Sequence, residues 1–195
     1  DFPILKTAEQ IEEEKDRKTS GEIPYYRFSP EVAEKAIRAL ENMDAPSYRN
    51  LRGSIVKALG KIFAKGIVGD EGIAFDKAVQ DPENAVIYVH KGKRASLVPC
   101  SEVYKLSAAR SSALLAELLA STHEGYVDSL LSANGIYELL QPNLSYDKQM
   151  TSLVSAENEA SISPSMGYAN AGQRIVSKGE IVTAEIAQML DSYRV

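Results

Sequence analysis

The strongest structural signals in the sequence are SPEVAEKAIRALENM at residues 29–43 and SYRNLRGSIVKALGKIFAKGI at residues 47–67. In both, apolar residues recur at the three- and four-residue spacing of a helix with one buried face. Ser29, Pro30 and Glu31 form a strong start signal, with a hydroxyl at the N-cap, a proline at the first position and an acid in the first turn. The first stretch is therefore predicted to be an amphipathic helix.

The second stretch carries matching signals at its ends. Ser47 is placed to cap the helix, and Gly66 fits the residue just past a helix end, with Ile67 supplying the apolar contact that often follows it. The sequence predicts that the two helices pair as an antiparallel hairpin.

The pattern changes to strands after this hairpin. Val86–Val89 and Ala95–Val98 are predicted to form a β-hairpin, with Lys91-Gly92-Lys93 as its turn. Three more helices are expected, at about residues 108–121, 127–133 and 148–159.

The C-terminal segment has a different character. Residues 161–182 have little helical period and contain three glycines, Gly167, Gly172 and Gly179. Because glycine adopts positive φ readily, we expect short strands joined by glycine turns, with Arg174–Val176 pairing with Ile181–Val182. Thr183 then caps a last helix.

At the other end of the chain, Thr7 and Gln10 match a capping box ahead of a charged helix that runs to Lys18. The whole chain is predicted to be α+β and mostly helical, with a β-hairpin near 85–98 and a small glycine-turn β element near 161–182. We expect one domain over residues 1–195, helical to about residue 160 and β-containing from about 161 to 195.

Composition excludes several classes of protein. The chain has 195 residues and a formal net charge of −5, so it lacks the basic surface of a nucleic-acid-binding protein. One cysteine, Cys100, cannot form an internal disulfide, and we interpret it as a small buried apolar residue. No run approaches the ~20 apolar residues of a membrane span. The chain opens on Asp1 and stops inside a helical pattern, so we expect a piece of a longer protein.

Catalytic motifs fail when tested for spacing. His123-Glu124 begins like a zinc-protease helix, but Val127 stands where the second histidine is needed. The other histidine, His90, has no second ligand type at metal spacing. We expect no catalytic residue, no metal ligand and no cofactor in this chain. A self-contained hydrolase with two carboxylates across a cleft remains an alternative.

Two segments are candidates for recognition. Tyr25-Tyr26-Arg27 lies in a predicted non-helical link and is placed to present aromatic faces to a ligand, the alternative being packing onto the helical hairpin. His90–Arg94 concentrates positive charge at the tip of the β-hairpin, the alternative being a solvated turn.

One segment resembles a known family. ISPSMGY at 162–168 and AGQRIVSKGEIVTAE at 171–185 are similar to the end of the extracytoplasmic domain of seven-transmembrane HD-domain proteins. DFPI at 1–4, IPYY at 23–26 and VIYV at 86–89 resemble the Bacteroidetes branch of that family. The positions that match the family motif are Gly167, Gly172, Gly179, Glu180 and Thr183.

The resemblance implies that the chain is an extracytoplasmic sensory domain without chemistry of its own. In the family, one membrane helix precedes the domain, and six helices and a cytoplasmic HD phosphohydrolase follow it. The resemblance implies that the parent hydrolyses cyclic di-AMP, with divalent metals only in the HD domain. Its partners would be an unknown small-molecule or envelope ligand and the rest of the parent. The residues expected to bind the ligand are Tyr25, Tyr26, Arg174 and Lys178. The alternative is an oligomerisation module that holds the parent as a homodimer or contacts the cell envelope.

Overall fold

The computed structural model describes residues 1–20, 22–44, 49–120 and 125–194. The chain divides into two compact units: unit 1 comprises Asp1–Glu22 and Ser152–Val195, and unit 2 comprises Ile23–Thr151. The fold class is α+β and predominantly helical, as predicted. The single domain over residues 1–195 stays a prediction, and each unit is described by itself.

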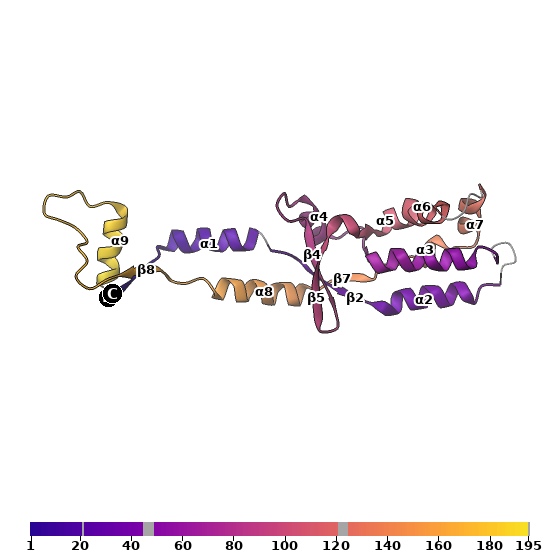
Figure 1. Cartoon of the computed structure of the whole chain (residues 1–195), viewed down its shortest axis with the longest axis horizontal. Coiled ribbons are helices and arrows are strands. Elements are labelled where there is room, and N and C mark those ends of the chain that lie inside the picture. Colours follow the sequence, from indigo (N-terminus) through magenta and orange to yellow (C-terminus); the bar gives the residue numbers. More distant parts are fainter. Residues whose placement is uncertain (21, 45–48, 121–124, 195) are drawn as a thin grey trace. The chain divides into compact units, whose positions relative to one another are not determined.

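Unit 2 contains the predicted helical hairpin. Helices α2 (Pro30–Glu41) and α3 (Arg52–Lys65) lie side by side and run antiparallel (Figure 1). Gly66 ends α3 with a φ of 102°, as its sequence position predicted. Ser29 is the N-cap of α2, but its side chain makes no cap hydrogen bond. The expected cap at Ser47 lies outside the described residues.

Further helices complete the core of this hairpin. They are α5 (Leu106–Ala108), a π-helical turn η3 (Ala109–Ala113), α6 (Leu114–Leu119), α7 (Val127–Ala133) and the 3₁₀ turn η4 (Tyr137–Leu139). The predicted helix at 108–121 is confirmed in the described part, and the one at 127–133 is confirmed. Leu40, Ile55, Leu59, Leu114 and Leu131 are fully buried where these helices meet.

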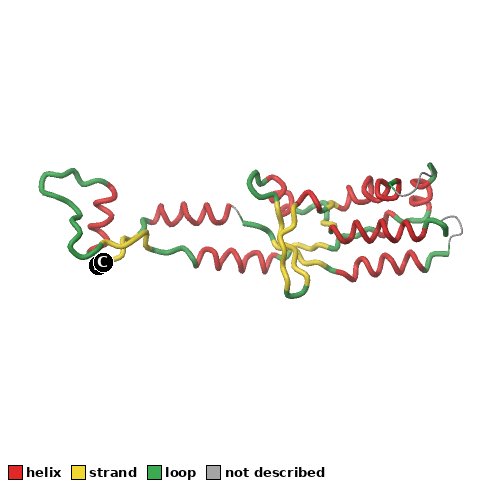
Figure 2. The backbone as a smooth tube through the Cα atoms, viewed as in Figure 1, coloured by secondary structure: helices red, strands yellow, loops and turns green. Residues whose placement is uncertain are grey.

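A four-stranded sheet forms the other half of unit 2, with strand order β5-β4-β2-β7 (Figure 2). The strands are β2 (Tyr25–Phe28), β4 (Val86–Lys91), β5 (Arg94–Pro99) and β7 (Leu144–Tyr146). The predicted β-hairpin is β4–β5 and is confirmed. The interpretation of Tyr25–Arg27 as a non-helical link missed β2, an inner strand that runs parallel to β4 and antiparallel to β7.

Smaller elements pack beside the sheet. A two-stranded parallel sheet joins β3 (Ile67–Val68) to β6 (Tyr104–Lys105), and α4 (Ile73–Gln80) and the 3₁₀ turn η2 (Cys100–Glu102) contact each other. These elements and the sheet enclose a second apolar core around Tyr26, Phe75, Ile87, Val89, Cys100 and Leu144.

Unit 1 brings together the two ends of the chain. Strand β1 (Phe2–Leu5) pairs antiparallel with β8 (Ser165–Ala169), and α9 (Ala184–Tyr193) packs on β1. Helix α1 (Ala8–Ser20) follows β1. Helix α8 (Lys148–Ala160) has its first turn in unit 2 and the remainder in unit 1. No helix among the described residues is long and apolar enough to cross a membrane.

Both predicted caps in unit 1 are confirmed. The Thr7 N–H donates to Gln10 Oε1 (3.0 Å) and the Gln10 N–H donates to Thr7 Oγ1 (3.2 Å), which is the reciprocal pattern of a capping box. Thr183 Oγ1 accepts from the Ile186 N–H at 3.3 Å at the start of α9.

The predicted pairing of Arg174–Val176 with Ile181–Val182 is wrong, because neither segment is a strand. The β element of this region is β8, whose partner is β1, at least 160 residues earlier in the sequence. Two of the three glycines have positive φ, Gly172 at 81° and Gly179 at 90°, whereas Gly167 lies in β8. Turns at these two glycines therefore lead from β8 to α9 without a local hairpin.

Candidate functional site

Asp147 joins the sheet of unit 2 to the first turn of α8. Its Oδ2 lies 3.2 Å from Arg27 Nη2 and 3.0 Å from His90 Nε2, and its Oδ1 accepts from the Met150 N–H at 3.0 Å. Arg27 and His90 are paired in register on the parallel strands β2 and β4. One carboxylate therefore holds two strands of the sheet and caps the helix that follows β7.

Backbone and hydroxyl contacts reinforce this junction. The Asp147 N–H donates to the Tyr25 carbonyl (2.8 Å), and the Tyr25 N–H donates to Thr151 Oγ1 (3.0 Å). The Thr151 hydroxyl donates in turn to the Asp147 carbonyl (2.8 Å), and its side chain is buried. The start of α8 is thus tied to β2 by both main chain and side chain.

The electrostatics of Asp147 follow from these contacts. The hydrogen bond from the Met150 N–H, and those from His90 and Arg27, lower the pKa of the Asp147 carboxyl below its ordinary value, against the opposing effect of partial burial. Asp147 is therefore an anion at neutral pH, which is the form that its three donors require.

A hollow of about 250 Å³ lies on the opposite face of the same sheet. Successive side chains of a strand point to opposite faces, so Arg27 and His90 lie on one face while their neighbours Phe28 and Lys91 lie on the other. The residues that line the hollow are Phe28, Ala64, Lys65, Gly66, Val89, Lys91, Ser96, Val98, Glu102 and Leu144.

The hollow combines an apolar floor with charged edges. The side chains of Val89 and Leu144 are buried beneath it, and the Lys91 ammonium lies 4.3 Å from the centre of the Phe28 ring. Lys65 and Glu102 also line the hollow, and the Lys65 ammonium lies 5.7 Å from the centre of the Tyr104 ring. An apolar floor with few polar groups at its edge is the usual character of a small-molecule site.

Gly66 and Asn143 hold together the elements beside the hollow. A Cβ at Gly66 would lie 2.5 Å from Leu144 Cδ1, so only glycine permits this close approach. Asn143 is buried, its Oδ1 accepts from the Ile67 N–H (2.7 Å), and its Nδ2 donates to the Phe63 carbonyl (2.8 Å). The end of α3, β3 and β7 are therefore held together by one side chain.

The two predicted recognition tyrosines occupy different environments. Tyr25 is half-buried and stacks on Tyr88 at 4.6 Å between ring centroids, on the Arg27 face of the sheet. Tyr26 is 3% exposed and packs against Phe75 in the core, where burial raises the pKa of its phenol to about 12. Tyr26 is therefore a core residue, as the packing alternative expected, but it packs against Phe75 of α4 and not onto the helical hairpin. Tyr25 still presents part of its surface.

The other two predicted ligand-binding residues, Arg174 and Lys178, lie in unit 1, in the segment between β8 and α9. They therefore do not share a unit with Tyr25 and Tyr26, and their role stays a prediction. His90, expected at a charged hairpin tip, lies instead against Asp147, and Lys91 lies over Phe28. Sequence reasoning missed Asp147, Lys65 and Glu102, because no local motif marks them.

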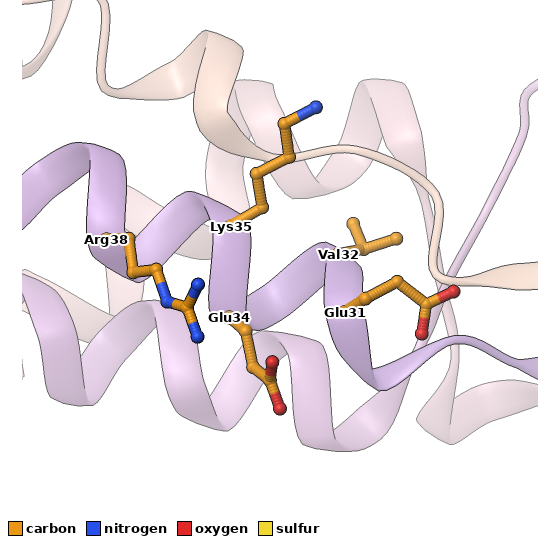
Figure 3. A pocket seen from close by; sticks show the side chains of 5 residues that line it. All are labelled: Glu31, Val32, Glu34, Lys35 and Arg38. Atoms are coloured by element: carbon orange, nitrogen blue, oxygen red, sulfur yellow. The ribbon is translucent and has the colours of Figure 1, made fainter.

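A second depression, of about 470 Å³, lies along α2. Figure 3 shows that all five residues lining it come from this one helix and that Lys35 extends away from Glu34 and Arg38, so the charged groups do not share one centre. Because recognition of a small molecule needs polar groups that converge, this surface is a weaker candidate than the hollow.

Within the described ranges, no group of three His, Cys, Asp or Glu side chains is placed to hold a metal ion, and His123 lies outside those ranges. Cys100 is buried, as predicted, and burial raises the pKa of its thiol, which opposes formation of the nucleophilic thiolate.

A family model described as "7TM-HD extracellular" matches residues 4–195. No curated protein and no solved structure gives a significant match.

Proposed function

Because the chain belongs to the family of extracellular domains of 7TM-HD membrane proteins, we propose that it is the sensory input domain of such a protein. This family is non-catalytic and is placed on the extracytoplasmic side of the membrane. The function is then to bind a ligand outside the cell membrane and to change the state of the attached protein.

The hollow on the sheet is the ligand site in this proposal. Two lysines, Lys65 and Lys91, line a hollow with an apolar floor, and this combination suits a small molecule with a carboxylate or phosphate attached to an apolar body. Glu102 at the same edge favours ligands that also carry a hydroxyl or amine.

The observation that carries the proposal is that strands β2 and β4 both line the hollow and contact Asp147 at the start of α8. Phe28 and Lys91 line the hollow, and the adjacent residues Arg27 and His90 hold Asp147 on the opposite face. A ligand that moves β2 or β4 therefore changes the contacts at the first turn of α8, whose remaining turns belong to unit 1. A ligand shifts such an equilibrium only by its difference in affinity for the two arrangements.

The attached enzyme in this proposal is an HD-type phosphohydrolase that cleaves a cyclic dinucleotide, cyclic di-AMP being the expected substrate. The divalent metals of that reaction belong to the HD domain. The support is the family membership, since the extracellular domain is defined by its occurrence in 7TM-HD proteins.

Thermal denaturation with defined probes tests the ligand site. We expect phenyl phosphate or benzoate to raise the melting temperature of the chain, and benzylamine to leave it unchanged. Lys91→Gln and Lys65→Gln should remove the response, because each removes the positive charge of a residue that lines the hollow. Lys93→Gln is the matched control, since Lys93 is exposed in the β4–β5 turn and does not line the hollow.

The proposed site is wrong if both anionic probes leave the wild type unchanged, or if Lys65→Gln and Lys91→Gln respond as the wild type does. An equal response to benzylamine would also contradict it, since the two lysines repel a cation.

A second candidate function is assembly of the parent as a homodimer. The specific observation is β5, which lies at the edge of the sheet, with Leu97 51% exposed. Such an edge carries backbone groups able to pair with another strand. A concentration-dependent dimer in sedimentation, lost on substituting Leu97→Pro within the edge, would favour assembly over ligand sensing.

A further inference from the structure

Unit 1 exposes several large apolar side chains. The exposed fractions are 84% for Ile181, 70% for Tyr168 and Tyr193, 55% for Met166 and 52% for Val182. Met166 and Tyr168 lie on one face of β8, Ile181 and Val182 directly precede α9, and Tyr193 ends it. Single exposed apolar residues are ordinary, but two adjacent β-branched residues with this exposure call for a partner.

The segment that presents Ile181 and Val182 has a defined path. The Ala171 N–H donates to Asp1 Oδ1 where the segment leaves β8, and the Ser177 N–H donates to Glu180 Oε2 within it. Thr183 then caps α9. Figure 1 shows this segment running outward beside α9 before it returns to the helix.

The first and last parts of the chain meet in this unit. The Phe2 and Tyr193 rings are in edge contact, with centroids 5.2 Å apart, and the Leu5 N–H donates to Ser192 Oγ at 2.9 Å. An extracellular domain of a seven-span protein is joined to its membrane spans through its ends. The membrane spans of such a protein would therefore adjoin unit 1, which holds both ends of the matched region.

We infer that the segment between β8 and α9 rests on the outer surface of the phospholipid bilayer, with Ile181 and Val182 inserted among the headgroups. Tyrosine is favoured at the membrane–water interface because its ring is apolar and its hydroxyl is polar, and Tyr168 and Tyr193 provide two such rings in the same unit. Amphipathic helices attach to membranes by burying apolar side chains at this depth, and Ile181 and Val182 would insert in the same way from a non-helical segment.

The charges of the segment agree with this partner. Residues 170–182 carry Arg174 and Lys178 against one acid, Glu180, whose Oε2 is already bonded to the Ser177 N–H. Basic side chains beside inserted apolar residues attract anionic headgroups. This inference depends on the family and on unit 1, and it stands or fails separately from the ligand site in unit 2.

The absence of tryptophan from the sequence allows a clean test. Ile181→Trp places a single reporter in the segment. Leu153→Trp places one on α8, at another exposed residue of unit 1, whose exposed fraction is 55%. Each chain is tethered through an N-terminal histidine tag to vesicles containing a nickel-chelating lipid, which replaces the high local concentration that attachment to a membrane gives. Emission is compared between vesicles of brominated and unbrominated phosphatidylcholine and phosphatidylglycerol.

We expect brominated lipid to quench Ile181→Trp and to leave Leu153→Trp unquenched. Without the tether, Ile181→Ser should weaken sedimentation with the same vesicles by about tenfold, because one buried isoleucine contributes roughly 1.5 kcal/mol or more. Arg174→Gln with Lys178→Gln should reduce binding to anionic vesicles only. Equal emission from Ile181→Trp in both kinds of vesicle, or equal quenching of both reporters, would overturn the inference.

Discussion

Gly66 ends α3, and two features of its position require glycine. Its φ is 102°, and a Cβ would lie 2.5 Å from Leu144 Cδ1 in a buried position. Gly66→Ala should therefore lower the free energy of unfolding by about 2–4 kcal/mol through backbone strain and overpacking.

Gly60 provides the matched control for this prediction. It lies within α3, and a Cβ there would meet no atom within 4 Å. Gly60→Ala should raise the free energy of unfolding by about 0.5–1 kcal/mol, because alanine loses less conformational entropy in a helix. Urea denaturation of both variants checks the pair, and a loss of stability for Gly60→Ala equal to that for Gly66→Ala would contradict the account.

Asn143 is the residue that sequence analysis left without a role. Its amide satisfies the Ile67 N–H and the Phe63 carbonyl, both of which are buried. Asn143→Leu should lower the free energy of unfolding by about 2–4 kcal/mol, because it leaves two buried backbone groups without a hydrogen-bond partner. Asn134→Ala, which removes one bond from a half-buried amide to the Leu130 carbonyl, should cost about 1 kcal/mol or less. Similar urea midpoints for the two variants would contradict this role of Asn143.

At the scale of the element, α8 depends on the charge of Asp147. The folded state lowers the pKa of this carboxyl, so the unfolded chain takes up the proton first as the pH falls. The stability that Asp147 provides is present at neutral pH and is lost as the pH falls through its folded-state pKa. Asp147→Asn should therefore lower the melting temperature at pH 7, and the difference from the wild type should shrink below about pH 4. A difference that is constant from pH 7 to pH 3 would contradict the assignment.

Elements were predictable where their physical cause is local. The capping box of Thr7 and Gln10, the cap at Thr183 and the glycine end of α3 each depend on residues within four positions, and all three are confirmed. The β4–β5 hairpin was predictable for the same reason. Strand β2 was not, because four residues between Pro24 and Ser29 are too few to display alternation.

Elements and contacts with distant partners could not be predicted. Strand β8 pairs with β1 across most of the chain, so the sequence pointed to a nearer partner that does not form. The residues that line the hollow come from six elements or lie next to them. In the Asp147 junction, Arg27 lies on β2, His90 lies on β4 and Asp147 follows β7. No local pattern specifies such a meeting. The family resemblance, by contrast, came from short local motifs, the most specific of them at residues 162–185, and the family is confirmed over residues 4–195.

At the scale of the whole molecule, the proposed ligand site and the proposed membrane contact lie in different units. Unit 2 holds the hollow and the Asp147 junction, and unit 1 holds both ends of the chain and the exposed segment around Ile181. Helix α8 is covalently shared between them. The proposal that this domain regulates an enzyme therefore predicts that a change at the junction alters the activity of the parent, although Asp147 performs no chemistry.

The most direct measurement of this claim is hydrolysis of cyclic di-AMP by the full-length parent in phospholipid nanodiscs, comparing the wild type with Asp147→Asn and with Lys93→Gln. The account predicts that Asp147→Asn changes the turnover rate by about fivefold, in the range of ordinary allosteric coupling, and that Lys93→Gln leaves it at the wild-type value. Failure of the wild-type parent to hydrolyse the dinucleotide would contradict the proposed enzyme. Equal rates for all three proteins would contradict the regulatory role of the domain.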